Sequence, residues 1–366
     1  MSKAKSSAPP EADAAAQLRR WVYLLLIVIA AGISVGRVFS VKAAHKRTPF
    51  LSANDRSRIA TVRALVDEGT YAIDNVIFET RDGVVLRDAT GAPIRKRDWH
   101  TIDMVRHPDR NGVMRSYSSK PTLLPTLLAS EYWLIKTATG MTLAEQPFYV
   151  GRAMLMLTNV APLVLYLLAM AWLIERYGAT DGGRIFVMAA AALGTFVPTY
   201  AVTINNHLPA TVSAAITAVA LLRILCDEDH RWQWFALAGL FSAFTAANEL
   251  PALSFFCLVA AVCVWKNRRQ TLVAFAPAAA VVALAAFGTN YLAHASWKPP
   301  YAHRKDGPTV ATLPAEAAEL LDRGQIPRAL ADVVAADPIQ QQLSPAAKVV
   351  VELPGERWRF SDRDEA

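Results

Sequence analysis

Apolar stretches with very few charged residues alternate with polar and basic segments along most of this chain. The first stretch covers residues 21–36, and six more follow at 147–173, 185–202, 208–225, 232–247, 251–265 and 272–293. About 20 helical residues cross the ~30 Å hydrocarbon core of a bilayer, because a helix rises about 1.5 Å per residue. The pattern predicts an all-α polytopic membrane protein with about seven transmembrane helices.

The stretches at 232–247 and 251–265 are the shortest, and Asn248-Glu249-Leu250-Pro251 stands between them. Two readings fit this pattern: two short helices that meet at a polar notch, or one long broken element. We favour two short helices, because Pro251 lacks a backbone N–H and interrupts helical hydrogen bonding.

The orientation follows from the basic residues of the short loops, which concentrate on the cytoplasmic side of membrane proteins. These residues are Lys3, Lys5, Arg19 and Arg20, then Arg176 and Arg184, Arg223 and Arg231, and Lys266, Arg268 and Arg269. All four groups fall on the same side when the N-terminus is cytoplasmic. We therefore expect residues 1–20 to form a disordered cytoplasmic tail and residues 21–40 the first span. The loop 41–146 and the C-terminal tail 296–366 are then extracytoplasmic. Residues 147–295 form a six-helix bundle in the plasma (inner) membrane.

The composition agrees with a membrane protein, with 53% hydrophobic and 19% charged residues. The predicted topology largely explains where the basic residues lie, so the net charge of +7 does not indicate a nucleic-acid partner. The three cysteines, Cys226, Cys257 and Cys263, lie in or at the inner edge of the bundle, which indicates no disulfide framework. Phosphate-binding-loop, dinucleotide-binding and serine-hydrolase motifs are absent from the sequence, which argues against nucleotide-driven pumping and serine hydrolysis.

The long outer loop contains patterns of its own. Ser52 precedes an apolar spacing that ends at Gly69, which predicts a short amphipathic helix at the membrane surface. Turn signals at Asp82-Gly83 and Thr90-Gly91 predict one or two small β-hairpins within residues 76–94. Apolar spacing returns over residues 121–139 with charged interruptions, which favours a juxtamembrane helix over a further span.

Several motifs of this loop follow one another in a familiar order. They are Asn54-Asp55-Arg56-Ser57-Arg58-Ile59-Ala60, Leu65-Val66-Asp67-Glu68-Gly69, Tyr117-Ser118-Ser119-Lys120-Pro121, Glu131-Tyr132-Trp133-Leu134 and Val150-Gly151-Arg152-Ala153. The order resembles the GT-C membrane glycosyltransferases, especially the aminoarabinose-transferase and protein-mannosyltransferase branch, over roughly residues 20–295. The resemblance implies transfer of a sugar from a polyprenyl-phosphate donor to a lipid, protein or glycan acceptor on the outer face of the membrane.

Such a transfer needs a carboxylate to take the acceptor's proton and cations to stabilise the leaving phosphate. Asp55 is the candidate base. The alternative for Asp55 is structural, because Ser52 and Asp55 also fit a helix capping box. Lys120 and Arg58 are the candidate phosphate contacts, although a loop lysine such as Lys120 is also a common interfacial anchor.

Further candidates for substrate binding are polar residues near the outer ends of the spans. They are Tyr117, Arg152, Asn206, His207 and Glu249. Each has a simpler reading: Arg152 as a snorkelling side chain, Asn206 and His207 as a solvated turn, and Glu249 as a loop residue. The residues His100, Asp103 and His107 lack the spacing of a metal site, so we expect neither a metal nor another cofactor.

The chain also departs from the family pattern. Arg56 occupies the position where the family usually has a second acidic residue, Thr122 replaces the second proline after Lys120, and the chain is shorter than most members. We therefore expect a truncated or divergent member, and a non-catalytic partner subunit is an alternative function. A transporter or lipid-binding protein is a further alternative, but it predicts inverted repeats and charges at mid-membrane, and the sequence has neither.

Overall fold

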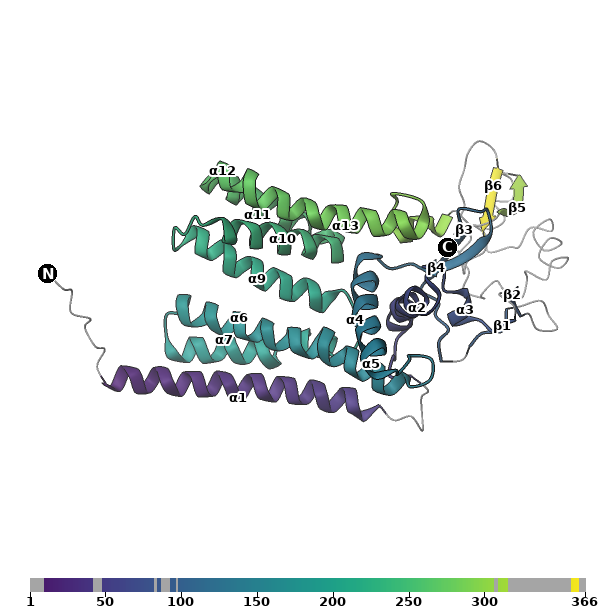
Figure 1. The fold of residues 1–366 in the computed structure, drawn as a ribbon. Helices are drawn as coiled ribbons and strands as arrows, with labels where there is room; N and C mark the ends of the chain where they lie inside the picture. Colours follow the sequence, from purple (N-terminus) through teal and green to yellow (C-terminus); the bar gives the residue numbers. More distant parts are fainter. Residues whose placement is uncertain are drawn as a thin grey trace. The chain divides into compact units, whose positions relative to one another are not determined.

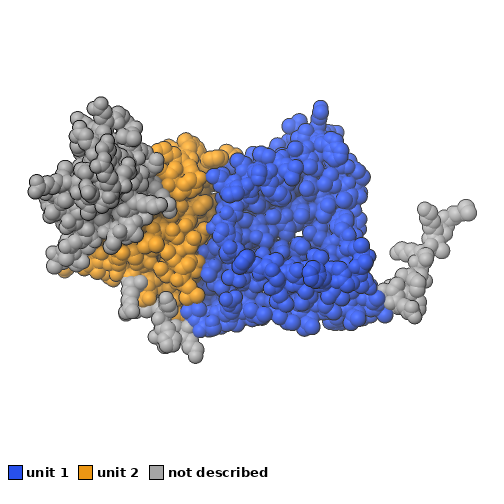
Figure 2. Space-filling model, turned by 180° about the vertical axis from the view of Figure 1, so that it is seen from behind, with its two compact units in different colours: residues 1–45, 151–283 blue, residues 46–150, 284–366 orange. Residues whose placement is uncertain are grey.

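The computed structural model describes residues 10–41, 48–81, 84–86, 93–96, 98–305, 309–314 and 357–361. The described chain is mostly helical, with a few short strands. It divides into two compact units, each of which is described by itself below. Unit 1 comprises Met1–His45 and Gly151–Ala283, and unit 2 comprises Lys46–Val150 and Leu284–Ala366 (Figure 2).

Five helical segments are long and apolar enough to cross a membrane, by length and composition. They are Ala14–Ser40, Pro147–Tyr177, Asp181–Tyr200, His207–Leu225 and Arg268–His294. These segments coincide with five of the seven apolar stretches of the sequence, which identifies a multi-pass membrane protein. The other two stretches form the shorter helices α10 (Trp232–Asn248) and α11 (Leu253–Lys266), joined by a 3₁₀ turn at Leu250–Ala252.

The first helix, α1 (Pro10–Ser40), begins earlier than the sequence analysis placed it. Residues 10–20 are helical, so the expected disordered tail is wrong for this part, and residues 1–9 lie outside the described residues. One reason is local: residues 14–16 are three consecutive alanines, the best helix formers, and only residues 17–20 separate them from the apolar stretch.

Unit 1 is a bundle of helices that run alongside one another (Figure 1). The helix α1 packs against α6 (Ala161–Tyr177) and α7 (Asp181–Leu193), while α9 (His207–Leu225) packs between α6 and α10. One buried apolar cluster contains Tyr23, Leu163 and Leu208. Large apolar side chains such as Phe186, at 73% exposed, cover the outside of the bundle, as expected for a surface that faces lipid.

Two of the spans contain a π-helical turn. The turn η1 (Met156–Val160) links α5 (Pro147–Leu155) to α6, and η3 (Thr271–Phe275) links α12 (Arg268–Gln270) to α13 (Ala276–His294). At η3 the helices come very close, since a Cβ atom on Gly239 of α10 would lie 2.3 Å from the carbonyl oxygen of Phe275. A glycine is therefore required at this crossing, as at other close helix contacts in membranes.

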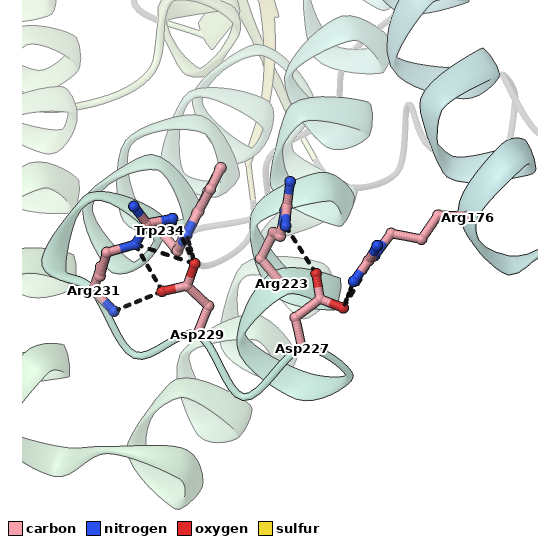
Figure 3. A network of polar contacts seen from close by, with 6 residues as sticks. All are labelled: Arg176, Arg223, Asp227, Asp229, Arg231 and Trp234. Carbon is pink, nitrogen blue, oxygen red and sulfur yellow. Dashed lines mark hydrogen bonds and ion pairs between the residues drawn. The ribbon is translucent and has the colours of Figure 1, made fainter. Parts of the chain in front are cut away.

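Ion pairs connect the ends of several helices in unit 1 (Figure 3). Asp227, just after α9, accepts hydrogen bonds from Arg176 of α6 and from Arg223 of α9, the latter at 3.1 Å. Asp229 accepts from Arg231 and from the indole N–H of Trp234, both at 2.7 Å. The basic residues of this predicted inner loop are thus paired with acids of the same loop.

Unit 2 is built around α2 (Ala53–Glu68) and α4 (Leu123–Thr139), which pack together. The helix α2 begins after Ser52 and ends at Gly69, whose φ of 70° is left-handed, so both ends lie where the sequence placed them. A short helix, α3 (Asp74–Ile77), leads to the strands β1 (Thr80–Arg81) and β2 (Val84–Val85), which pair antiparallel. Both predicted turns, at Asp82-Gly83 and Thr90-Gly91, lie outside the described residues.

The remaining strands of unit 2 were not expected from the sequence. The strands β3 (Met104–Pro108) and β4 (Met114–Ser118) form an antiparallel hairpin, and β5 (Thr309–Pro314) pairs with β6 (Arg357–Ser361). The 3₁₀ turn η4 (Pro300–Lys305) packs against β3. This contact brings residues that follow the last span to the hairpin of the long loop.

Candidate functional site

A cavity of about 770 Å³ lies within unit 2. Its walls come from the α2–α3 connection (residues 68–75), the β3–β4 turn (residues 109–111), strand β4, and the C-terminal end of α13 (residues 292–295). Four segments that are far apart in the sequence therefore share one hollow. Cavities of a few hundred to about 1,000 Å³ are typical of small-molecule sites.

The acidic residues of the cavity wall are held in place by backbone groups. Both carboxylate oxygens of Asp74 accept the N–H of Ser116, at 3.1 and 3.0 Å, and burial raises the pKa of Asp74. One oxygen of Asp109 accepts the N–H groups of Asn111 and Val113, at 2.8 and 2.9 Å. These contacts fix the wall of the cavity before any ligand binds.

Aromatic and imidazole rings form another part of the wall. Tyr117 lines the cavity, and its ring stacks on His107 with a centroid distance of 4.4 Å. His107 stacks in turn on His303 at 4.5 Å, and its Nε2 lies 3.0 Å from Nδ1 of His294. Burial raises the pKa of Tyr117 to about 12, so its phenol is neutral at physiological pH.

A second, much smaller cavity of about 10 Å³ shares Tyr71, Tyr117 and His294 with the first and also touches Lys120. Lys120 forms an ion pair with Asp103 at 3.2 Å. Of the residues predicted to bind substrate, Tyr117 and Lys120 are therefore brought to one place, although the charge of Lys120 is shared with an acid.

Asp55, the predicted base, lies at the start of α2 and lines neither cavity. The Ser52 hydroxyl donates to its Oδ1 at 2.8 Å and accepts the Asp55 N–H at 3.0 Å, while Leu51 N–H donates to Oδ2 at 3.3 Å. This is the capping box that the sequence offered as the alternative. Burial raises the pKa of Asp55 to about 6, although the hydrogen bonds from Ser52 and Leu51 lower it.

Two arginines accompany Asp55 on α2. Arg58 is buried and donates to the side-chain oxygen of Asn54, and its charge lowers the pKa of Asp55. Arg56 donates to the carbonyl of His100 at 2.8 Å. Both guanidinium groups bind the surrounding protein, and neither lines the two cavities.

The remaining predicted residues belong to unit 1. Asn206 donates to Oε1 of Glu249 at 2.5 Å and to the carbonyl of Asn248 at 3.0 Å, and His207 pairs with the same carboxylate. The His207 ring also contacts Tyr200 at 4.6 Å between centroids. The structure thus joins Asn206, His207 and Glu249 into one polar cluster, formed by the start of α9 and the end of α10.

Arg152 has a different environment within unit 1. It donates to the carbonyl of Val41 at 2.7 Å, and its guanidinium lies 4.9 Å from the ring centroid of Phe39. A cation at the C-terminal end of a helix is favoured by the helix dipole. Arg152 therefore holds the end of α1.

No group of three or more His, Cys, Asp or Glu side chains in the described part of the chain is arranged to hold a metal ion. Of the histidines considered for such a site, His100 is half-buried, and the loss of solvation lowers its pKa to about 4. His107 instead belongs to the ring cluster with His294 and His303.

Sequence reasoning missed His294, at the end of the last span. His294 ends α13 and His303 lies in η4, and only the fold brings them to the hairpin that contains His107 and Tyr117. The sequence signal was slight: two histidines shortly after an apolar stretch.

No family model matches the chain, and neither a curated protein nor a solved structure matches it. The function is therefore inferred from the residues and geometry of this chain alone.

Proposed function

We propose that this protein is a membrane glycosyltransferase of the GT-C type. It would move a sugar from a polyprenyl-phosphate donor to a lipid, protein or glycan acceptor on the outer face of the plasma membrane. The observation that carries the proposal is the polar cavity of about 770 Å³ in unit 2, the unit that contains the long loop between the first two apolar stretches.

The lining of this cavity suits a polyhydroxylated group near an anion. The carboxylates of Asp74 and Asp109 and the amide of Asn75 provide hydrogen-bonding groups for hydroxyls, and the ring of Tyr117 provides a flat apolar face. Arg115 and its neighbour Arg110 add positive charge that favours a phosphate. A sugar attached to phosphate combines both chemistries.

The proposal includes the full topology of seven spans. In it, α10 and α11 are two short spans that place Glu249 near the outer surface, and α4 lies along that surface. Leu127, Trp133 and Leu134 of α4 support this placement, because these large apolar side chains are 47%, 54% and 59% exposed. A tryptophan on an otherwise amphipathic helix is typical of the membrane–water interface.

In the proposed reaction an acceptor hydroxyl oxygen attacks the anomeric carbon of the donor sugar. The bond from that carbon to the phosphate oxygen breaks, and polyprenyl phosphate leaves with the electron pair. Asp55 takes the hydroxyl proton, because a carboxylate with a pKa of about 6 is mostly ionised at neutral pH. Lys120 and Arg58 stabilise the phosphate charge.

The test is transfer by purified protein in lipid nanodiscs supplied with labelled polyprenyl-phosphate sugars. We expect Asp55→Asn to lower turnover by about 100-fold or more, since removal of a general base typically has this effect. Ser52→Ala is the matched control, because it removes the capping hydroxyl and keeps the carboxylate. Equal turnover of wild type and Asp55→Asn would exclude Asp55 as the base, and a folded wild type that transfers none of the sugars would exclude the transferase.

One observation favours the second candidate, a non-catalytic partner subunit. Asp55 and Arg56, at the two positions where the family usually has acids, both bind local backbone groups in this structure. Their positions are then structural, and the chain would support the activity of another subunit. This reading predicts that the isolated protein binds a polyprenyl-phosphate sugar but does not transfer it. Asp55→Asn should bind the same sugar as well as the wild type does.

A further inference from the structure

The hydrogen bond between His107 and His294 determines where the hydrogen atoms of both rings lie. Nδ1 of His107 is 2.9 Å from the carbonyl oxygen of Pro108, which can only accept, so Nδ1 of His107 carries a hydrogen. In a neutral ring, Nε2 of His107 is then an acceptor. Nε2 of His107 lies 3.0 Å from Nδ1 of His294, so Nδ1 of His294 carries the hydrogen of that bond.

Both rings of this pair are buried away from water. His107 and His294 are 3% and 6% exposed, and an imidazolium in such surroundings would lose its hydration. The His107 ring lies between the rings of Tyr117 and His303, with interplanar angles of 10° and 29°. This stacking fixes the ring plane of His107 and thereby the direction of its bond to His294.

The other ring nitrogen of His294, Nε2, is an acceptor that no donor in the described part of the protein contacts. With its hydrogen on Nδ1, His294 has a lone pair on Nε2, and this atom is buried without a hydrogen-bond partner among the described residues. Buried polar atoms are nearly always paired, and an unpaired one commonly marks a place for a bound group. His294 lines both the large and the small cavity.

We infer that Nε2 of His294 accepts a hydrogen bond from a hydroxyl group of a polyhydroxylated ligand in the cavity of unit 2. His107 acts as a positioning residue, because it sets the tautomer of His294 and does not line the cavity. A phosphodiester or carboxylate oxygen carries no hydrogen and cannot take the place of this hydroxyl. The inference rests on the proposed function only for the identification of this ligand as a sugar.

The experiment is nitrogen NMR of the full chain in nanodiscs with ¹⁵N-labelled histidine. The probes are a panel of methyl glycosides of hexoses and pentoses, and dimethyl phosphate, a diester without a hydroxyl group, is the anionic comparison. We expect His294, identified by the signal that is lost in His294→Gln, to have hydrogen on Nδ1 and an unprotonated Nε2. The Nε2 signal should move when a glycoside binds and stay unchanged with dimethyl phosphate.

Two variants separate the role of each ring. His294→Gln should weaken glycoside binding by about tenfold, the effect of losing one hydrogen bond to a buried group. His107→Phe keeps an aromatic ring between Tyr117 and His303 and removes the acceptor, so we expect the Nδ1-protonated signature of His294 to disappear. His230→Gln, a substitution in a loop of unit 1, is the control and should change neither measurement.

The outcomes distinguish this inference from the transferase proposal. Hydrogen on Nε2 of His294, undiminished glycoside binding in His294→Gln, or binding of no glycoside by the wild type would each overturn the inference. Glycoside binding at His294 without sugar transfer supports the inference and counts against the transferase. Sugar transfer that is unchanged in His294→Gln supports the transferase and counts against the inference.

Discussion

Arg19 and Glu175, which lie 156 positions apart in the chain, form a two-pronged ion pair in unit 1. Nε and Nη2 of Arg19 donate to the two carboxylate oxygens of Glu175 at 3.0 and 3.1 Å. The Tyr23 hydroxyl donates to the same carboxylate at 2.8 Å, and Asp181 accepts from Nη1 of Arg19. The contact joins α1 to α6 and α7, and it explains why residues before the first apolar stretch are helical.

Loss of this ion pair should weaken the packing of α1. We expect Glu175→Gln to lower the free energy of unfolding by about 1–3 kcal/mol, because the guanidinium is largely buried and loses a charged partner. Thermal unfolding of detergent-solubilised protein measures the effect. Glu228→Gln is the matched control, since Glu228 pairs with Lys266 but is 61% exposed, and solvent weakens such a pair. Equal shifts for both variants would contradict a special role for Arg19.

The buried carboxyl of Asp55 predicts a characteristic pH dependence of stability. Burial raises the pKa of Asp55 from its ordinary value of 3.8 to about 6, so the folded protein binds this proton more tightly than the unfolded chain. Stability therefore rises as the pH falls from about 6 towards 4, by about 3 kcal/mol from this group. Asp55→Asn removes this gain and should be at least as stable as wild type at pH 8.

Unfolding midpoints between pH 4 and 8 test this expectation. Ser52→Ala is the informative comparison, because it removes hydrogen bonds that lower the pKa of Asp55 and should move the transition to higher pH. If wild type and Asp55→Asn show parallel curves over the whole range, the carboxyl is not held at a raised pKa. This test depends only on folding, so it remains valid whatever the protein catalyses.

Local signals in the sequence were sufficient for the elements that depend on neighbouring residues. Ser52 and Gly69 mark the two ends of α2 because capping is a matter of the few residues around each end. Five spans are visible because an apolar stretch of sufficient length needs no partner to be recognised. His207 and Glu249 were both candidates from the sequence, because each lies at an end of an apolar stretch, and the structure pairs them.

The parts that the sequence did not predict depend on contacts between distant segments. The hairpin β3–β4 has few β-branched residues, and it is held by Asp74 and by the turn at Asp109. The cavity wall combines Tyr117 with His294, whose rings meet only after folding. The capping contacts of Asp55 were predicted as an alternative, but its burial follows from the packing around α2, which a local pattern does not contain.

The close contact at Gly239 predicts a strong effect of a single methyl group. Gly239→Ala places a Cβ atom 2.3 Å from a backbone carbonyl, so α10 and η3 must separate. We expect a loss of about 1–3 kcal/mol in stability or a failure to accumulate in the membrane, as for other overpacked interiors. Gly36→Ala in α1 is the control, because a Cβ atom there meets nothing within 4 Å and alanine favours the helix. Similar accumulation of both variants would contradict the close crossing.

The arrangement of α10 and α11 as two short spans predicts which side of the membrane each of their ends reaches. Cys226 is exposed at the end of α9, and Ser254 is exposed in the first turn of α11. If α10 crosses the membrane, Cys226 is cytoplasmic and Ser254 extracytoplasmic. A membrane-impermeant maleimide applied to intact cells should therefore label Ser254→Cys in a background with Cys226→Ala and Cys257→Ala. With Cys257→Ala alone, Cys226 should react only after permeabilisation. Protection of Ser254→Cys until the cells are opened would place both sites on one side and leave α10 and α11 as elements that enter the bilayer without crossing it.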